Sequence, residues 1–261
     1  MSVIDLVREG DEYVGWGVRG RGSRIFGGST LGQALRAADL AIGGTRRADA
    51  LHAIFVAPGD CEHPVRYRVR PLKRGRTLDV VTIEALQADR TILTAHATFH
   101  DGQTSPQFQD APPPVPPPSA LASVESALSP GGEAIRAPFD VRPAPRDDGE
   151  PQSETWIRFR GDIPAKTSNT DAALLVYAMD FLITRPAHIP LDPQRVSLFG
   201  ASLDHAMWVH RPFDLTQWHL VSARATSFTG SRSHCHAQVF DARGDLVASG
   251  TQEALLPPAS A

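Results

Sequence analysis

Cysteine is scarce in this chain of 261 residues, which has only Cys61 and Cys235. Two cysteines rule out a disulfide framework and a zinc site made of cysteines alone. An excess of one charge is also missing, because 26 Lys and Arg residues stand against 29 Asp and Glu residues, a net charge of −3. Proteins that bind nucleic acids usually carry a clear basic excess, so we expect no nucleic-acid partner.

Long apolar runs are missing too. The longest, residues 172–179, falls well short of the roughly 20 residues that a membrane helix needs, so we expect no membrane span. Asp5, Arg8 and Glu9 stand where a signal peptide would have its apolar run, which argues against export. We therefore expect a soluble, cytoplasmic protein, whose length suits one large domain or two of roughly 130 residues.

Three motifs that would indicate a cofactor, a nucleophile or a metal lack the context that such sites need. Residues 15–20 have the spacing G-x-G-x-x-G, but no buried strand precedes them and no helix follows directly. Residues 200–204 resemble a nucleophile elbow and break its pattern at Asp204. In a strand, His234 and His236 face one way and Cys235 the other, so they cannot hold one ion. We predict no cofactor and no metal.

A proline-rich stretch divides the chain. Seven of the positions 106–118 are proline, which fixes its own φ and cannot donate a hydrogen bond to a helix or a sheet. We interpret the stretch as an exposed linker. The predicted organisation is a first unit over residues 1–105, a linker and connecting segment over 106–150, and a second unit over 151–261.

The two units carry similar patterns. In the first, apolar residues from Leu31 to Ile42 lie on one face of a helix that ends at Gly43-Gly44, and strands are predicted over 51–57, 65–71, 78–88 and 91–99. In the second, a helix beginning at Thr170 is apolar nearly all round, and strands are predicted over 202–209, 218–226, 233–240 and 246–256. Three pairs of equivalent positions have offsets of 153 to 156, which indicates a tandem repeat. A helix that is apolar on all sides must be wrapped by its sheet, so each unit is predicted to be α+β.

Several ordered motifs point to one family. The second unit contains Ser202-Leu203-Asp204-His205, then His210-Arg211-Pro212, and finally Leu246-Val247-Ala248-Ser249 with Gln252-Glu253. The first contains Phe26-Gly27-Gly28 and a histidine ahead of a Pro-Gly-Asp turn. This series resembles the acyl-CoA thioesterase II family over nearly the whole chain apart from the proline-rich linker. The resemblance implies a double hotdog fold, in which two tandem antiparallel sheets are each wrapped around a long helix.

The resemblance also implies a hydrolase that splits acyl-CoA into a free carboxylic acid and CoA. By position, the family's catalytic Asp, Thr or Ser, and Gln fall on Asp204, Thr226 and Gln252, which would together hold one water molecule. A carboxylate accepts the proton of that water, while a hydroxyl and an amide fix its orientation. By analogy with the family we further expect a homo-oligomer.

Two more residues are expected at the substrate. The backbone N–H of Gly28, at the start of the first helix, is the hypothesised donor to the oxyanion. His52 matches a family histidine near the site, although a structural position in the core is an equal alternative. Two other functions stay open: a hotdog-fold enoyl-CoA hydratase or dehydratase using His52 and Asp204, and a non-catalytic acyl-CoA-binding protein.

The densest basic patch consists of Arg66, Arg68 and Arg70, which alternate with apolar residues, and the nearby Lys73, Arg74 and Arg76. Such a run is typical of a solvated strand face. The alternative is a surface that meets the phosphates of a substrate.

Overall fold

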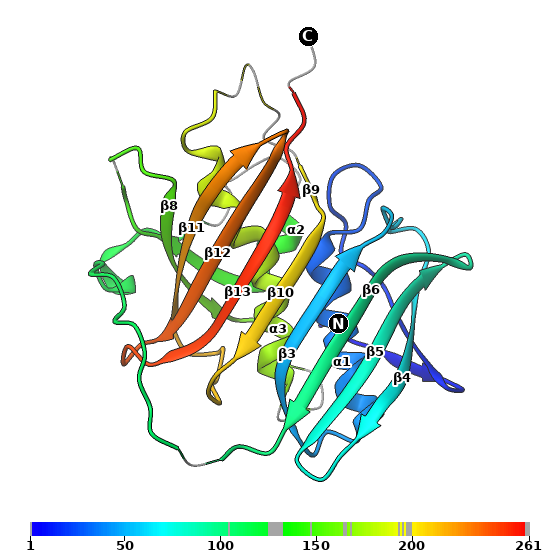
Figure 1. Cartoon of the computed structure of the whole chain (residues 1–261). Helices are drawn as coiled ribbons and strands as arrows, with labels where there is room; N and C mark the ends of the chain where they lie inside the picture. Colours follow the sequence, from blue (N-terminus) through cyan, green and yellow to red (C-terminus); the bar gives the residue numbers. More distant parts are fainter. Residues whose placement is uncertain are drawn as a thin grey trace.

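Two similar α+β units make up the protein, as a computed structural model shows (Figure 1). The structure describes residues 2–103, 105–124, 133–146, 148–163, 166–167, 169–192, 194, 196 and 200–258. The first unit contains a long helix, α1 (Gly27–Ile42), and six strands: β1 (Val7–Glu9), β2 (Glu12–Gly15), β3 (Arg47–Phe55), β4 (Val65–Arg74), β5 (Leu78–Gln87) and β6 (Arg90–His100). Gly43 ends α1 with a φ of 88°, a left-handed conformation that glycine adopts without steric cost.

The second unit repeats this plan around the buried helix α3 (Thr170–Leu182). Its strands are β7 (Phe139–Pro143), β8 (Gln152–Phe159), β9 (Ala201–Ser202), β10 (Asp204–Val209), β11 (His219–Thr229), β12 (Arg232–Asp241) and β13 (Leu246–Leu255). Three short helices complete the described part of the chain: η1 (Pro118–Ala120), α2 (Glu133–Arg136) and η2 (Arg185–His188).

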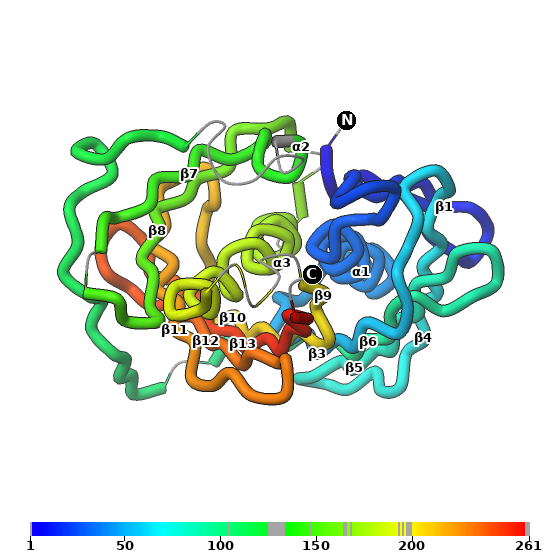
Figure 2. The backbone as a smooth tube through the Cα atoms, turned by 90° about the horizontal axis from the view of Figure 1, so that it is seen from above, coloured from blue at the N-terminus to red at the C-terminus, as the bar shows by residue number. Residues whose placement is uncertain are grey.

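The sheets of the two units join edge to edge through β3 and β10. These strands pair antiparallel, with Leu51 opposite Met207, and the order along the sheet is β1-β2-β4-β5-β6-β3-β10-β13-β12-β11-β8-β7, with β9 on β13. The predicted double hotdog is therefore confirmed, and its two sheets form one continuous antiparallel sheet curved around both helices (Figure 2).

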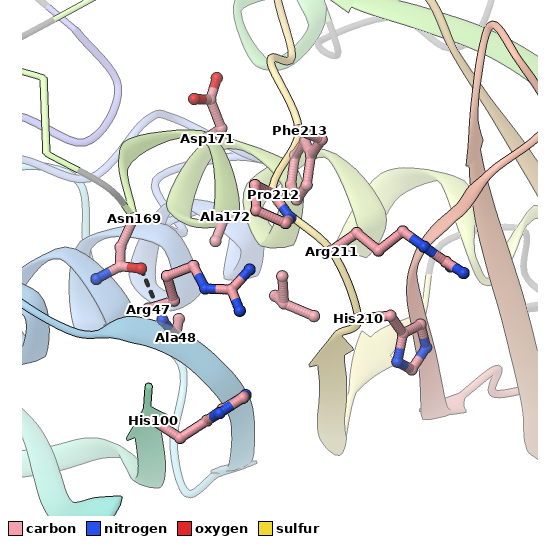
Figure 3. Close-up of a pocket in the computed structure, with 11 residues that line it drawn as sticks. Arg47, Ala48, His100, Asn169, Asp171, Ala172, His210, Arg211, Pro212 and Phe213 are labelled. Carbon is pink, nitrogen blue, oxygen red and sulfur yellow. Dashed lines mark hydrogen bonds between the residues drawn. The ribbon is translucent and has the colours of Figure 1, made fainter. Parts of the chain in front are cut away.

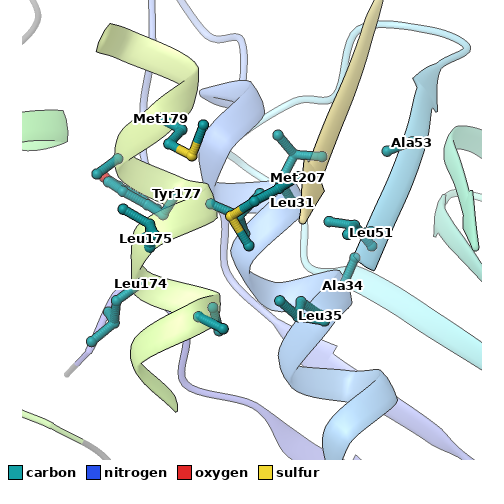
Figure 4. Packing of buried hydrophobic residues seen from close by; sticks show 14 of the residues in the cluster. Leu31, Ala34, Leu35, Leu51, Ala53, Leu174, Leu175, Tyr177, Met179 and Met207 are labelled. Atoms are coloured by element: carbon teal, nitrogen blue, oxygen red, sulfur yellow. The ribbon is translucent and has the colours of Figure 1, made fainter. Parts of the chain in front are cut away.

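The two long helices pack closely and antiparallel at the centre of the molecule. A Cβ atom at Gly28 would lie 2.4 Å from the backbone oxygen of Tyr177, and one at Gly32 would lie 2.8 Å from that of Ala173. Both positions must therefore be glycine for the backbones to approach this far. Figure 4 shows side chains of both helices meeting Leu51 of β3 and Met207 of β10, so the two units share one core.

The stretch 106–150, predicted as a proline-rich linker and connecting segment, has two parts. Its proline-rich part lies along the second unit, where the backbone oxygens of Pro116 and Pro118 accept hydrogen bonds from Trp156 Nε1 (3.0 Å) and Arg142 Nη1 (2.8 Å). Its later part includes β7, which pairs with β8 at one edge of the sheet, so the second unit begins before residue 150. Residues 125–132 and 147 lie outside the described residues. Among the described helices, none has the length and apolar character that crossing a membrane requires.

Candidate active site

A cavity of about 800 Å³ opens where the N-terminus of α1 meets the C-terminus of α3. Its walls are largely apolar and include Phe26, Phe55, Ile92, Phe181 and Leu256. Its polar lining includes Asp180, Ser202 and His188. A cavity of this size, with apolar walls and a few polar groups, is typical of a site for a small molecule.

The Asp180 carboxylate is held in place by three hydrogen bonds. Asp180 belongs to the last turn of α3 and is 6% exposed. Its Oδ2 accepts the backbone N–H of Gly28 at 2.7 Å. Its Oδ1 accepts bonds from Ser202 Oγ and Gln252 Nε2, both at 2.8 Å. The N-terminus of α1 adds a favourable dipole beside this negative charge.

The amide of Gln252 is fully used within this network. Gln252 is 0% exposed, and its Nε2 also donates to Ser202 Oγ at 2.8 Å. Its Oε1 lies 2.6 Å from Nδ1 of His205. Both amide hydrogens and the amide oxygen therefore have partners inside the protein, as a buried amide requires.

The structure does not bring the side chains of Asp204, Thr226 and Gln252 together. Asp204 is exposed, and its Oδ1 accepts the backbone N–H of Glu253 at 2.7 Å. The physical reason is the alternation of side chains along β10, which turns His205 and Met207 inward and Asp204 outward. The carboxylate next to Gln252 belongs to Asp180 instead.

Thr226 also lies apart from Gln252. Its side chain is exposed, and its Oγ1 is 2.9 Å from Nδ1 of His234. The pairing of β11 with β12 shifts register between Ala225 and Ser227, so Thr226 occupies a β-bulge, where simple alternation does not set the direction of the side chain. Ala225 and Cys235 face the interior at this point.

The two expected substrate-binding residues have different surroundings. Gly28 lies at the site, but its N–H donates to Asp180 and is not free for an oxyanion. Gly27, one residue earlier, borders the cavity. His52 is exposed on β3 and contacts the ring of Trp208 edge-on at 5.1 Å between centroids. It is neither a core residue nor part of the cavity lining.

The basic patch on β4 is a solvated strand face. Arg66 pairs with Glu9 and Glu12, and Arg68 also pairs with Glu12. Arg74 donates to the backbone oxygens of Ala41 and Ile42 at the end of α1. Within the described part of the chain, no three His, Cys, Asp or Glu side chains gather as they would around a metal ion.

The opposite end of the helix pair holds a much smaller hollow of about 50 Å³ (Figure 3). Here Asp39 of α1 occupies the place that Asp180 has at the other end. Its Oδ1 accepts from Asn169 Nδ2 at 2.6 Å and its Oδ2 from Arg36 Nη1 at 3.2 Å. Asn169 Oδ1 in turn accepts the N–H of Ala48 at 2.6 Å. Protein side chains thus close this end, whereas the cavity at the other end has the Asp180 carboxylate in its wall.

Comparison with known proteins agrees with this architecture. The family model of the acyl-CoA thioesterase N-terminal domain matches residues 17–100, and that of the C-terminal domain matches residues 99–256. The chain belongs to the acyl-CoA thioesterase family. The two models meet at the end of β6.

Named relatives match over most of their length. Acyl-CoA thioesterase 2 of Haemophilus influenzae is 30% identical over 89% of this chain and 87% of its own. Acyl-coenzyme A thioesterase 8 of Homo sapiens is 29% identical over 89% of this chain and 80% of its own. The crystal structure of acyl-CoA thioesterase II TesB2 from Mycobacterium marinum is 28% identical, covers 99% of this chain and 98% of its own, and has a TM-score of 0.84.

Three residues of the site were missed by the sequence analysis: Asp180, Ser202 and His205. Asp180 had a detectable signal, because it is a carboxylate between the apolar runs 172–179 and 181–183, and a buried carboxylate needs donors. Ser202 and His205 belong to the recognised Ser-Leu-Asp-His motif, but the motif does not say which of its side chains face inward.

Proposed function

We propose that this protein hydrolyses acyl-CoA thioesters with a water molecule activated by Asp180. The observation that carries the proposal is the Asp180 carboxylate, fixed by three donors and bordering a large apolar cavity. The family relationship supports the same reaction, because the curated relatives are named as acyl-CoA thioesterases.

The residues of the site suit this chemistry. Asp180 takes a proton from the water while the water oxygen attacks the thioester carbonyl carbon. The tetrahedral intermediate then breaks its C–S bond, and the proton passes to the sulfur of the departing CoA. Gln252 and Ser202 keep the carboxylate in position, so that no rearrangement of the site is needed as the water reacts.

We place the parts of the substrate against different walls of the cavity. We place the acyl chain against the aromatic and aliphatic side chains, among them Phe55 and Phe181. The oxyanion is placed at the first turn of α1 beside Gly27, where the helix dipole favours negative charge. Arg21 and Arg24, exposed residues of the same lining, bring positive charge for the phosphates of CoA. Association into a homo-oligomer stays a prediction.

Thiol release from a panel of short, medium, long and aromatic acyl-CoAs tests the proposal. We expect turnover by the wild type and a loss of about 10²- to 10⁴-fold in kcat for Asp180→Asn, the range that a general base contributes. Asp204→Asn is the matched control, because this carboxylate faces outward, and it should keep activity within about twofold, since surface substitutions have small effects.

Circular dichroism checks that both variants are folded. A large loss of kcat in Asp204→Asn together with a small loss in Asp180→Asn would show that Asp204, and not Asp180, is the catalytic carboxylate. A folded wild type that releases no thiol from any acyl-CoA would refute the hydrolytic function. Mass spectrometry of the product tests the hydratase alternative, because hydration leaves the thioester intact. The His52 and Asp204 pair that this alternative was to use lies outside the cavity lining.

A further inference from the structure

His205 is buried beside the site without touching the cavity. It follows Asp204 on β10, faces the interior and is 1% exposed. Its Nδ1 lies 2.6 Å from Oε1 of Gln252, and its Nε2 is buried with no hydrogen-bond partner among the described residues. A buried polar atom without a partner costs about 1–3 kcal/mol, so an apolar residue here would avoid a penalty that histidine incurs.

The hydrogen bonds determine which nitrogen of His205 carries the proton. A carboxylate only accepts, so Gln252 must turn its Nε2 toward Asp180 and its Oε1 toward His205. An amide oxygen also only accepts, so Nδ1 of His205 must donate. Burial lowers the pKa of the His205 ring, which keeps it neutral and leaves its Nε2 unprotonated. The ring is therefore the Nδ1–H tautomer.

We propose that His205 is a positioning residue for the reaction, because its Nδ1–H locks the Gln252 amide in the orientation that holds the Asp180 carboxylate. The inference rests on the proposed function and assigns this residue a part in the same site. The chain of contacts runs from His205 through Gln252 to Asp180, with distances of 2.6 Å and 2.8 Å.

The hydrogen bond from His205 is needed because the Gln252 amide has two orientations of nearly equal shape, in which its oxygen and nitrogen exchange places. If Gln252 turned over, its oxygen would face Oδ1 of Asp180, and two acceptors would then repel each other. Ser202 Oγ would also lose the donor that it accepts from. The carboxylate would move away from the reacting water, which lowers the rate of the chemical step without removing the cavity that binds the acyl chain.

Two substitutions at position 205 separate hydrogen bonding from packing. His205→Leu fills the space but cannot donate, whereas His205→Asn places an amide N–H near the position of Nδ1. For His205→Leu we expect kcat to fall at least about tenfold, with KM nearly unchanged. A tenfold change lies within the range of coupling energies that residues in contact show. His205→Asn should recover most of this loss. Equal losses in the two folded variants, or a His205→Leu variant with wild-type kcat, would overturn the proposal.

A double-mutant cycle with Gln252→Ala shows whether His205 acts through the amide. We expect His205→Leu to change kcat by less than about twofold when Gln252 is already alanine, because the group that it positions is gone. The same loss of kcat in both backgrounds would mean that His205 acts by another route, and the proposal would be wrong.

The tautomer provides a readout that does not depend on turnover. In the ¹⁵N-labelled full-length protein, long-range ¹H–¹⁵N correlations of the His205 ring should show a protonated Nδ1 and an unprotonated Nε2 at neutral pH. An Nε2–H tautomer, whose Nδ1 carries no proton and cannot donate to Gln252, would contradict the proposal. If the wild type turns over no acyl-CoA and this tautomer is nevertheless found, the hydrolytic function fails while the hydrogen-bond assignment stands.

Discussion

Neighbouring residues of strand β10 differ sharply in solvent exposure. Asp204 and His205 are adjacent in the chain, yet the first is exposed and the second is 1% exposed. Because side chains alternate along a strand, a shift of one position exchanges every inward residue for an outward one. The motif containing both residues could be recognised from the sequence, but the face that each occupies could not.

Ser202 offers a test of the network at the scale of one hydroxyl group. Its Oγ donates to Asp180 and accepts from Gln252. We expect Ser202→Ala to lower kcat/KM by about tenfold, because a hydrogen bond to a charged group contributes about 1.5–3 kcal/mol. Steady-state thiol release measures the change.

The matched control for this variant is Ser249→Ala. Ser249 Oγ makes a hydrogen bond of similar length, 2.9 Å, to Nε2 of exposed His210. Its loss should leave kcat/KM within about twofold, as is usual for surface substitutions. Equal effects of the two alanine variants would show that Ser202 has no special part in the site.

At the scale of elements, the site depends on how closely the two long helices approach. The first turn of α1 delivers the Gly28 N–H to the last turn of α3, where Asp180 accepts it. The sequence predicted both helices and most of the strands because their apolar periodicities are clear. It predicted neither their antiparallel contact nor the role of the glycines in it, since glycines inside a helix look like weak points.

Gly32→Ala tests the contact between the two long helices, because we expect it to lower stability where helix propensity alone would raise it. Intrinsic helix propensity favours alanine by about 1 kcal/mol. The new Cβ, however, would lie 2.8 Å from the backbone oxygen of Ala173 and 3.0 Å from a side-chain carbon of Ile4. We expect the free energy of unfolding to fall by about 1–3 kcal/mol because of overpacking. Urea denaturation measures it, and a stabilised variant would show that the helices can separate without cost.

At the scale of the whole molecule, the proline-rich stretch is held to the second unit by a buried charge cluster. Asp140 on β7 is 3% exposed and contacts Arg142 and Arg158 at 3.1 Å each. Arg142 Nη1 in turn donates to the backbone carbonyl oxygen of Pro118 at 2.8 Å. The sequence identified the stretch as extended, but its course along the second unit follows from these contacts.

Asp140 makes the stability of the protein depend on pH. Burial alone would raise the pKa of its carboxyl, but hydrogen bonds from Arg142, Ser123 and Arg158 hold the pKa below its usual value. The stabilisation is therefore complete above the unfolded pKa of about 3.9 and is lost as pH falls through the lower folded pKa. We expect Asp140→Asn to lose about 3–5 kcal/mol at neutral pH and to show a weaker dependence on pH below about 4.

Denaturant titrations at several pH values check this prediction. Asp162→Asn, which changes an exposed aspartate of the same unit, should leave the free energy of unfolding at neutral pH nearly unchanged. Parallel pH curves for the wild type and Asp140→Asn would contradict the proposed contribution of the cluster.

The sequence by itself determined the repeated α+β units, the family and Gln252 as a candidate site residue, because periodicity and ordered motifs are local properties of the chain. Only the tertiary structure decided which carboxylate meets that amide. Asp180 reaches Gln252 across 72 positions of sequence and Gly28 across 152, and such contacts depend on the helix packing and on the face of each strand. Those are set by the register of the joined sheet and by a β-bulge at Thr226, which no local pattern specifies.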